Sequence, residues 1–221
     1  MSDGILIESA RENISKRGQE MVEQGLTTGV GGNLSQRGGD SMIAISPSGI
    51  PYDRITPAMV PVVDLDGDHV AGEEEPSTET PMHTRIYRNR PQVDAIVHTH
   101  SPYATALSSL GEPIPPSHYL VSFIGDEVPV AGYATPGSEE LGQKAADTLG
   151  ESYNACLLQN HGVISVAENV ENAIETALMV EFCARTHYLA STLGDPVMVP
   201  DESIRDLQSG LDEYRSIKQQ D

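Results

Sequence analysis

Two histidines separated by a single residue, in His98-Thr99-His100, form the sharpest chemical pattern in this chain. Residues 93–98, which lead into this pattern and include its first histidine, are mostly apolar and predict a strand. In a strand, residues i and i+2 point to the same face of the sheet. The two imidazoles would then lie side by side and supply half of the ligands of a zinc ion. Two ordinary polar residues at the end of a strand are the alternative interpretation.

A third ligand has to come from another segment of the chain. His161 has the most comparable setting, because it lies in Gln-Asn-His-Gly (159–162) between two expected strands. Three histidines with open positions would form a catalytic site, since structural zinc sites are closed and usually rich in thiolates. Cys156 and Cys183 do not have the spacing of a thiolate site. Imidazole ligands also accept cobalt or manganese, so these residues do not identify the metal.

Three segments offer backbone amides and hydroxyls that could bind a small anion. Gly-Val-Gly-Gly-Asn (29–33) follows an expected helix and leads into a strand, which is the reverse of a dinucleotide-binding motif. Ser-Pro-Ser-Gly (46–49) and Glu-Pro-Ser-Thr-Glu (75–79) add further donors. A doubly charged phosphate needs several donors when cations are scarce. Together the segments indicate a phosphate site, and ordinary tight turns are the alternative.

The elements that must position these residues follow from periodicity, caps and turn signals. They alternate without a long linker or an internal repeat, so we expect one layered α/β domain over residues 1–221, with a flexible tail from about residue 200. Helices are expected at 5–25, 81–89, 101–110, 138–149 and 170–193, and strands at 34–37, 42–46, 62–65, 69–71, 93–98, 155–159 and 163–166.

The composition is strongly acidic, with 33 Asp and Glu against 13 Lys and Arg and a formal net charge of -20. Such a polyanion repels nucleic acid and anionic membranes, so neither is expected as a partner. Acidic excess with scarce lysine suits a cytoplasm at high salt, and we infer a halophilic source; an ordinary acidic mesophilic protein is the alternative. Two cysteines without paired spacing favour a reducing compartment, and a cytoplasmic protein is predicted.

The motifs together resemble the class II aldolase and adducin family, nearest its L-fuculose-1-phosphate aldolases. The resemblance covers almost the full chain and includes further motifs at Ser-His-Tyr (117–119) and Tyr-Ala-Thr (133–135). It implies a three-layer α/β/α fold around a mixed, mostly antiparallel sheet. It also implies a homotetramer with each active site at a subunit boundary.

The resemblance assigns roles to individual residues. The zinc ligands would be His98, His100 and His161, together with Glu79, which would also act as the acid/base carboxylate. Tyr119 and, in the tail, Tyr214 would be catalytic tyrosines. The phosphate contacts would come from Gly32, Asn33, Ser48, Gly49, Ser77 and Thr78.

The sequence departs from the family pattern at Val30, where a threonine hydroxyl is usual, so phosphate affinity or substrate preference is expected to differ. The remaining histidines receive no catalytic role. We expect His83 and His118 to pack or to hydrogen-bond, and His69 and His187 to lie on the surface or on a helix face.

The reaction that the resemblance implies is cleavage of a ketose 1-phosphate, with L-fuculose 1-phosphate as the leading substrate, into dihydroxyacetone phosphate and a short aldehyde. None of the three lysines lies in a motif, so a Schiff-base mechanism is poorly supported. A dehydratase or a sugar-phosphate 4-epimerase of the same family is the alternative. The epimerase pattern, however, resembles Pro-Ser-Ser-Asp at the position of the carboxylate, where this chain has Glu79. A non-enzymatic adducin-like module is disfavoured by the retained histidines.

Overall fold

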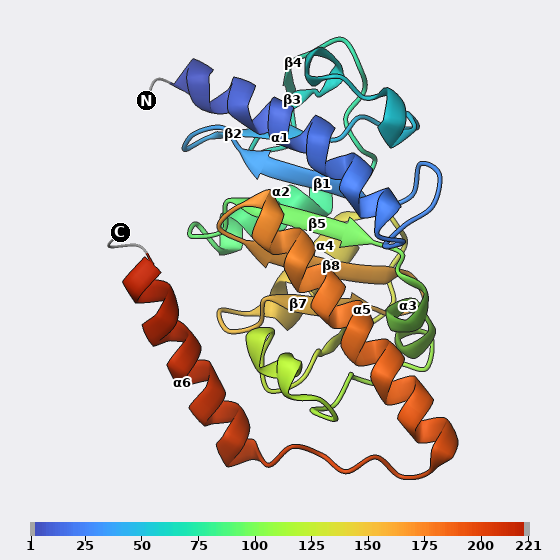
Figure 1. Ribbon diagram of the computed structural model, residues 1–221. Helices are drawn as coiled ribbons and strands as arrows, with labels where there is room; N and C mark the ends of the chain where they lie inside the picture. The colour runs from blue at the N-terminus through green and yellow to red at the C-terminus, as the bar shows by residue number, and fades with distance from the viewer. Residues whose placement is uncertain (1–2, 219–221) are drawn as a thin grey trace.

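One eight-stranded sheet forms the centre of the protein (Figure 1). The structure is a computed structural model that describes residues 3–218, with side chains for residues 4–210. The strand order is β4-β3-β2-β1-β5-β8-β7-β6, and every neighbouring pair is antiparallel except β6 with β7. The expected mixed, mostly antiparallel sheet is thus confirmed. The strands are β1 Asn33–Arg37, β2 Met42–Ile45, β3 Val62–Asp64, β4 His69–Ala71, β5 Ala95–Thr99, β6 Val130–Ala131, β7 Ala155–Leu158 and β8 Gly162–Ala167.

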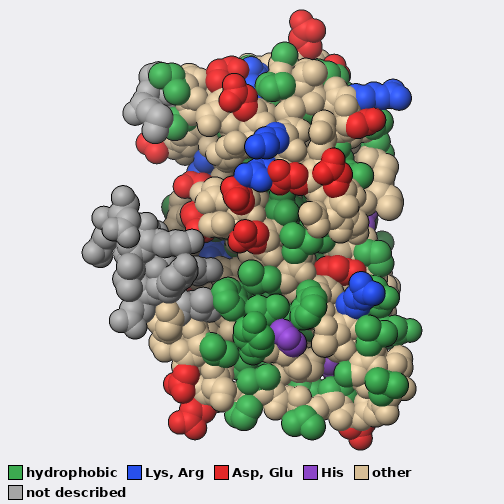
Figure 2. Space-filling model, viewed as in Figure 1, with side chains coloured by type: hydrophobic (Ala, Val, Ile, Leu, Met, Phe, Trp, Pro, Cys, Tyr) green, Lys and Arg blue, Asp and Glu red, His purple; other side chains and the backbone are tan. Residues whose placement is uncertain are grey.

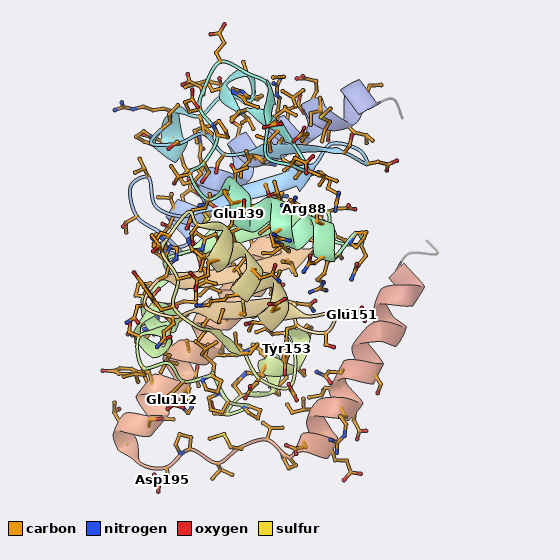
Figure 3. All side chains as sticks on the ribbon, turned by 180° about the vertical axis from the view of Figure 1, so that it is seen from behind. Arg88, Glu112, Glu139, Glu151, Tyr153 and Asp195 are labelled. Atoms are coloured by element: carbon orange, nitrogen blue, oxygen red, sulfur yellow. The ribbon has the colours of Figure 1, made fainter. Side chains whose placement is uncertain are left out.

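Helices cover both faces of the sheet and complete three layers. The helices α1 and α5 cross the near face in Figure 1, and α3 packs beside α5. The view from behind in Figure 3 shows α2 and α4 side by side on the opposite face. The helices are α1 Asp3–Glu23, α2 Thr80–Asn89, α3 Pro102–Ser108, α4 Glu139–Leu149, α5 Val170–Leu193 and α6 Asp201–Lys218, with short 3-10 turns at η1 Tyr52–Arg54, η2 Pro57–Met59 and η3 Tyr119–Phe123.

The central strand β5 connects the two hydrophobic layers because its side chains alternate between the faces of the sheet. Ile96 packs into the cluster under α2 and α4, whereas Ala95 and Val97 pack into the cluster under α1 and α5. His98 therefore lies on the same face as Ile96, at the carboxyl end of a fully buried strand. Because its neighbours on both faces are buried, the pairing register of β5 is fixed, and this register places His98 and His100 at the end of the strand.

Most expected elements are present, and the differences have local causes. The strand expected at 93–98 begins at Ala95, because the Val93 N–H donates to the Arg90 carbonyl in the preceding turn. The helix expected at 101–110 is shorter, Pro102–Ser108, with Ser101 at its N-cap. The short elements η3 and β6 were not expected. None of the helices within residues 3–218 combines the length and hydropathy that crossing a bilayer requires.

The segment expected to be a flexible tail is helical. Residues Asp201–Lys218 form α6, which packs on η3 and places the side chain of Ile204 in a buried position. The Val199 N–H also donates to the Pro116 carbonyl at 2.8 Å, which attaches the preceding segment to the domain.

Candidate active site

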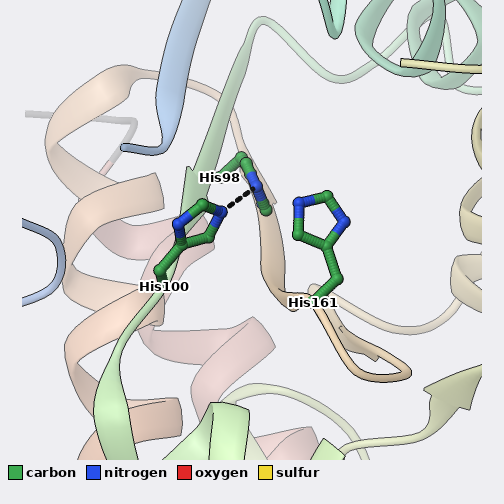
Figure 4. Close-up of side chains that lie close together, drawn as sticks. All are labelled: His98, His100 and His161. Atoms are coloured by element: carbon green, nitrogen blue, oxygen red, sulfur yellow. Dashed lines mark hydrogen bonds between the residues drawn. The ribbon is translucent and has the colours of Figure 1, made fainter. Parts of the chain in front are cut away.

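Three histidine rings from two separate segments converge on one point (Figure 4). His98 comes from β5, His100 follows that strand directly, and His161 lies in the turn between β7 and β8. The ring centroids are 4.8 Å apart for His98 and His100, 4.7 Å for His98 and His161, and 5.3 Å for His100 and His161. One nitrogen from each ring lies within 4.8 Å of the others. The segments that carry His98 and His161 are more than sixty residues apart in the sequence, and the antiparallel pairing of β5 with β8 brings them together.

The backbone around these rings leaves no space for larger residues. Asn160 adopts φ 57°, and among the residues described it is the non-glycine residue with a left-handed backbone, a conformation that asparagine tolerates. This turn directs His161 toward β5. A Cβ at Gly162 would clash with the Thr99 carbonyl, and a Cβ at Gly32 would come within 2.5 Å of the His98 carbonyl oxygen. Both glycines therefore allow close approach of backbone to the histidine segment.

The protonation of His98 is fixed by a backbone carbonyl. Its Nδ1 lies 2.8 Å from the Val163 oxygen, which only accepts, so Nδ1 carries a proton and Nε2 points into the cluster, where a neutral ring would offer its lone pair to a metal ion. Nε2 of His100 lies 3.0 Å from that nitrogen. Burial, assisted by repulsion from the neighbouring rings, lowers the pKa of His100 to about 4, and burial also lowers the pKa of His161. Neutral imidazoles of this kind are the form that binds a metal ion.

The carboxylate of Glu79 lies against the histidine cluster from the N-cap of α2. Its Oε2 is 3.1 Å from Nε2 of His98, and its Oε1 is 3.4 Å from Nε2 of His161. Burial acts to raise the pKa of Glu79, but the combined effect of His98, His161 and a hydrogen bond from Asn33 lowers it well below its usual value. The group is therefore a carboxylate at neutral pH.

The donor set fits a divalent metal ion. Within the described part of the chain, Oε1 of Glu79 is buried without a hydrogen-bond partner although it faces the imidazole nitrogens. A buried, unpaired carboxylate oxygen is costly unless another group satisfies it. Three neutral imidazoles and one carboxylate would hold such an ion and could leave positions open for substrate.

A cavity of about 230 Å³ opens beside the cluster. It is lined by Glu79, His100 and His161, so the cavity and the histidine cluster form one site. Larger hollows of about 610 and 500 Å³ lie elsewhere and contain none of these histidines, so size alone does not identify the site. All six residues expected to contact phosphate also line the cavity: Gly32, Asn33, Ser48, Gly49, Ser77 and Thr78.

The anion-binding part of this cavity relies on neutral donors, since no Lys or Arg is among the lining residues described. Backbone N–H groups and hydroxyls in a shielded site can stabilise a phosphate without a cation. Tyr52 supports the glycine segment from below by donating its hydroxyl to the Gly32 carbonyl at 3.0 Å. Val30 is at the rim and half exposed, and it presents an apolar side chain where a hydroxyl would add one more donor.

Of the two expected tyrosines, Tyr119 is not placed at this site within one chain. Tyr119 lies on η3, is half exposed and does not line the cavity. The side chain of Tyr214 lies outside the described residues. His118 accepts the Leu120 N–H at 3.3 Å, and His187 contacts the Ser117 hydroxyl at 3.1 Å, so both have local hydrogen-bonding partners. His69 is exposed.

Two residues of the site were not expected from the sequence. Pro136 lines the cavity from the loop that follows Tyr-Ala-Thr (133–135), and that motif was the available signal. His83, expected only to pack or hydrogen-bond, is fully buried and bonded to Asn33 beside Glu79. Its position four residues after Glu79, one helical turn away, was the available signal.

Comparisons with known proteins agree with this geometry. The class II aldolase and adducin N-terminal domain family matches residues 12–188. A 5-deoxy-D-ribulose 1-phosphate aldolase of Bacillus thuringiensis serovar kurstaki is 38% identical over 211 residues, 95% of this chain and 99% of that protein. An L-fuculose phosphate aldolase of Escherichia coli K12 is 39% identical over 187 residues, 84% of this chain and 86% of that protein. A solved L-fuculose 1-phosphate aldolase superposes with a TM-score of 0.89 at 41% identity, covering 92% of this chain and 96% of the other.

The fold and the site define a class II aldolase, a metal-dependent lyase that cleaves a carbon-carbon bond. The chain belongs to the class II aldolase and adducin family. The resemblance inferred from the motifs is thereby confirmed.

Proposed function

We propose that this enzyme cleaves a ketose 1-phosphate into dihydroxyacetone phosphate and a short aldehyde, with zinc as its metal and L-fuculose 1-phosphate as the first candidate substrate. The observation that carries the proposal is the position of Glu79 between the three histidines and a cavity lined by neutral anion donors. A phosphate in that cavity would place the adjoining ketone close to the carboxylate and the imidazoles.

His98, His100 and His161 would hold the zinc ion, with Glu79 as an additional ligand in the resting enzyme. Bound there, the ion would act as a Lewis acid that stabilises negative charge on the ketone oxygen. Cobalt or manganese would serve in the same ligand set. The exposed side of His100 leaves the cluster open toward the cavity.

The protein's own residues would move the protons. In the cleavage direction, a base removes the proton from the hydroxyl on the aldehyde side, and the carbon-carbon bond breaks as the aldehyde forms. Tyr119, contributed by a neighbouring subunit, would exchange that proton, because an un-ionised phenol donates to an alkoxide in the reverse direction. Glu79, a carboxylate in the resting enzyme, would take up a proton from solvent and deliver it to the carbon next to the ketone, which completes dihydroxyacetone phosphate, while the hydroxyl proton would leave through Tyr119 to solvent.

A second candidate substrate is 5-deoxyribulose 1-phosphate, which would give acetaldehyde in place of lactaldehyde. The observation that favours it is the alignment with the Bacillus thuringiensis enzyme, which extends over 95% of this chain against 84% for the Escherichia coli enzyme.

We expect dihydroxyacetone phosphate to be released from both sugars, because they share the phosphate, the ketone and the bond that is cleaved and differ by one CH(OH) group at the aldehyde end. Measuring kcat/KM for each sugar, with coupled detection of dihydroxyacetone phosphate and identification of the aldehyde, would decide the order. A higher value for 5-deoxyribulose 1-phosphate would assign the second substrate. No release from any ketose 1-phosphate would contradict the proposal.

We further infer a cytoplasmic homotetramer whose active sites lie at subunit boundaries. Tyr119 is exposed and lies beside His118, whose ring contacts Phe182 on α5. Hydrophobic side chains gather over the lower half of the face in Figure 2. Exposed apolar residues on and after α5 support an interface there, and they are Phe182, Tyr188, Leu189, Leu193, Val197 and Met198.

Assembly and activity are expected to depend together on salt. Each chain carries a net charge of -20, and salt at about 1 M shortens the reach of that repulsion to roughly 3 Å. We expect a tetramer in molar salt that dissociates and loses activity together as the salt is lowered. Sedimentation and activity measured on the same dilution series would test this, and a fully active monomer would exclude a shared site.

Subunit mixing provides the control for the shared site. Chains carrying His98→Ala and chains carrying Tyr119→Phe should each be inactive or severely impaired, and a mixed oligomer should regain activity, because some boundaries then combine intact histidines with an intact tyrosine. A mixture of His98→Ala with His161→Ala should gain nothing, since both changes affect every chain's own cluster. Equal behaviour of the two mixtures would contradict the role of Tyr119.

A further inference from the structure

A chain of buried polar side chains extends from the core to Glu79. From the N-cap of α2 along the helix, Glu79, His83 and Tyr87 follow one another at intervals of four residues. On the facing strand β1, Asn33 and Ser35 are two residues apart and therefore point to the same face. The distances are 2.9 Å from Tyr87 Oη to Ser35 Oγ, 2.6 Å from Ser35 Oγ to His83 Nδ1, 2.5 Å from His83 Nε2 to Asn33 Oδ1, and 2.8 Å from Asn33 Nδ2 to Glu79 Oε2.

The direction of each hydrogen bond follows from the chemistry of the groups. A carboxylate only accepts, so the Asn33 amide directs its NH₂ group toward Glu79 and its oxygen toward His83. That oxygen also only accepts, so Nε2 of His83 must carry a proton. In a neutral ring Nδ1 then accepts from the Ser35 hydroxyl, and Ser35 in turn accepts from Tyr87.

His83 is a neutral ring in this arrangement. Its side chain is fully buried, and burial is the main cause that lowers its pKa to about 3. A neutral imidazole has one donor and one acceptor nitrogen, and here both are used. Reversing the Asn33 amide would place its oxygen against the Glu79 carboxylate and its NH₂ group against the His83 N–H. Both contacts would be repulsive, so the ring allows one amide orientation.

A histidine that only filled this space would cost more free energy of folding than an apolar residue would. Burying polar groups between a sheet and a helix costs free energy unless each is satisfied, and an apolar residue of the same size carries no such requirement. The network ends on Oε2 of Glu79 and leaves Oε1 without a partner among the described residues. Its effect is therefore to fix one carboxylate oxygen and to leave the other for the metal or the substrate proton.

We propose that His83 is a positioning residue: by donating from Nε2 to the Asn33 amide oxygen, it sets the orientation of that amide and thereby of the Glu79 carboxylate. This inference rests on the proposed function, in which Glu79 transfers the proton. It adds a residue that touches neither substrate nor metal but acts through Asn33.

The test compares three variants in the metal-loaded enzyme. His83→Phe fills the space but removes the donor, and we expect kcat and solvent deuterium exchange into dihydroxyacetone phosphate to fall by roughly 10- to 100-fold, as when an outer partner of a metal ligand is lost. Metal content should be largely retained. His83→Gln places an amide N–H near the former Nε2 and should restore most of the activity. Tyr87→Phe, buried at the far end of the same network, should keep kcat close to that of the wild type.

A measurement on the unaltered enzyme covers the case in which His83→Phe does not fold. Nitrogen NMR of the histidine-labelled holoenzyme should show His83 with Nε2 protonated, and an Nδ1-protonated ring would overturn the proposal. Wild-type kcat and exchange in a folded, metal-loaded His83→Phe enzyme would also overturn it. If Glu79→Gln itself exchanges at the wild-type rate, the proposed function fails instead, so the two failures are distinguishable.

Discussion

Replacing His98, His100 or His161 with alanine is expected to remove both the bound metal and carbon-carbon cleavage. The three ring nitrogens lie within 4.8 Å of one another, and each supplies one of the neutral ligands that a catalytic site requires. The carbonyl of Val163 already holds His98 in the tautomer that directs Nε2 inward. Metal analysis of each purified variant, combined with an assay for dihydroxyacetone phosphate, would measure both effects on one sample.

The matched control is His69→Ala. His69 is exposed on β4 and bonds only locally, to the carbonyl of Ala71 at 2.9 Å, so its loss should leave metal content and activity unchanged. A cluster variant that keeps stoichiometric metal together with activity would show that the assignment of that histidine as a ligand is wrong.

Glu79→Gln is expected to keep the fold and most of the metal but to lose roughly 10²- to 10⁴-fold in rate, the range that a positioned acid/base group contributes. The amide oxygen can still accept from Asn33 and occupy the same place, but the amide cannot take up the proton. Exchange of solvent deuterium into dihydroxyacetone phosphate isolates this step, because it requires no aldehyde.

Glu73→Gln makes the same chemical change on an exposed loop six residues away and should exchange at the wild-type rate. Wild-type exchange in the Glu79 variant would remove the carboxylate from the mechanism, even if its place beside the histidines were retained.

Much of the site could be predicted because it depends on local spacing. His98 and His100 are two residues apart on a strand, so their side chains share a face, and the residues around His161 indicate a turn. Both predictions hold whichever strands become neighbours in the sheet. The phosphate segments were likewise visible as clusters of Gly, Ser and Thr. What spacing alone did not provide was the pairing of β5 with β8, which brings His161 to the other two.

The parts that escaped prediction depend on contacts between distant segments. The network through His83 requires β1 and α2 to be docked in register, since Asn33 and Ser35 belong to one and His83 and Tyr87 to the other. The C-terminal helix α6 did have a local signal, namely Pro200 followed by Asp201 and Glu202 in the first turn. Its packing on η3 is what places Ile204 in a buried position.

Removal and return of the metal test the central claim most directly. We predict that chelated enzyme, kept in high salt, releases no dihydroxyacetone phosphate from L-fuculose 1-phosphate or 5-deoxyribulose 1-phosphate. Titration with zinc should restore cleavage in proportion to the ion added, until each chain holds one. Undiminished cleavage by enzyme shown to be free of metal would contradict the account.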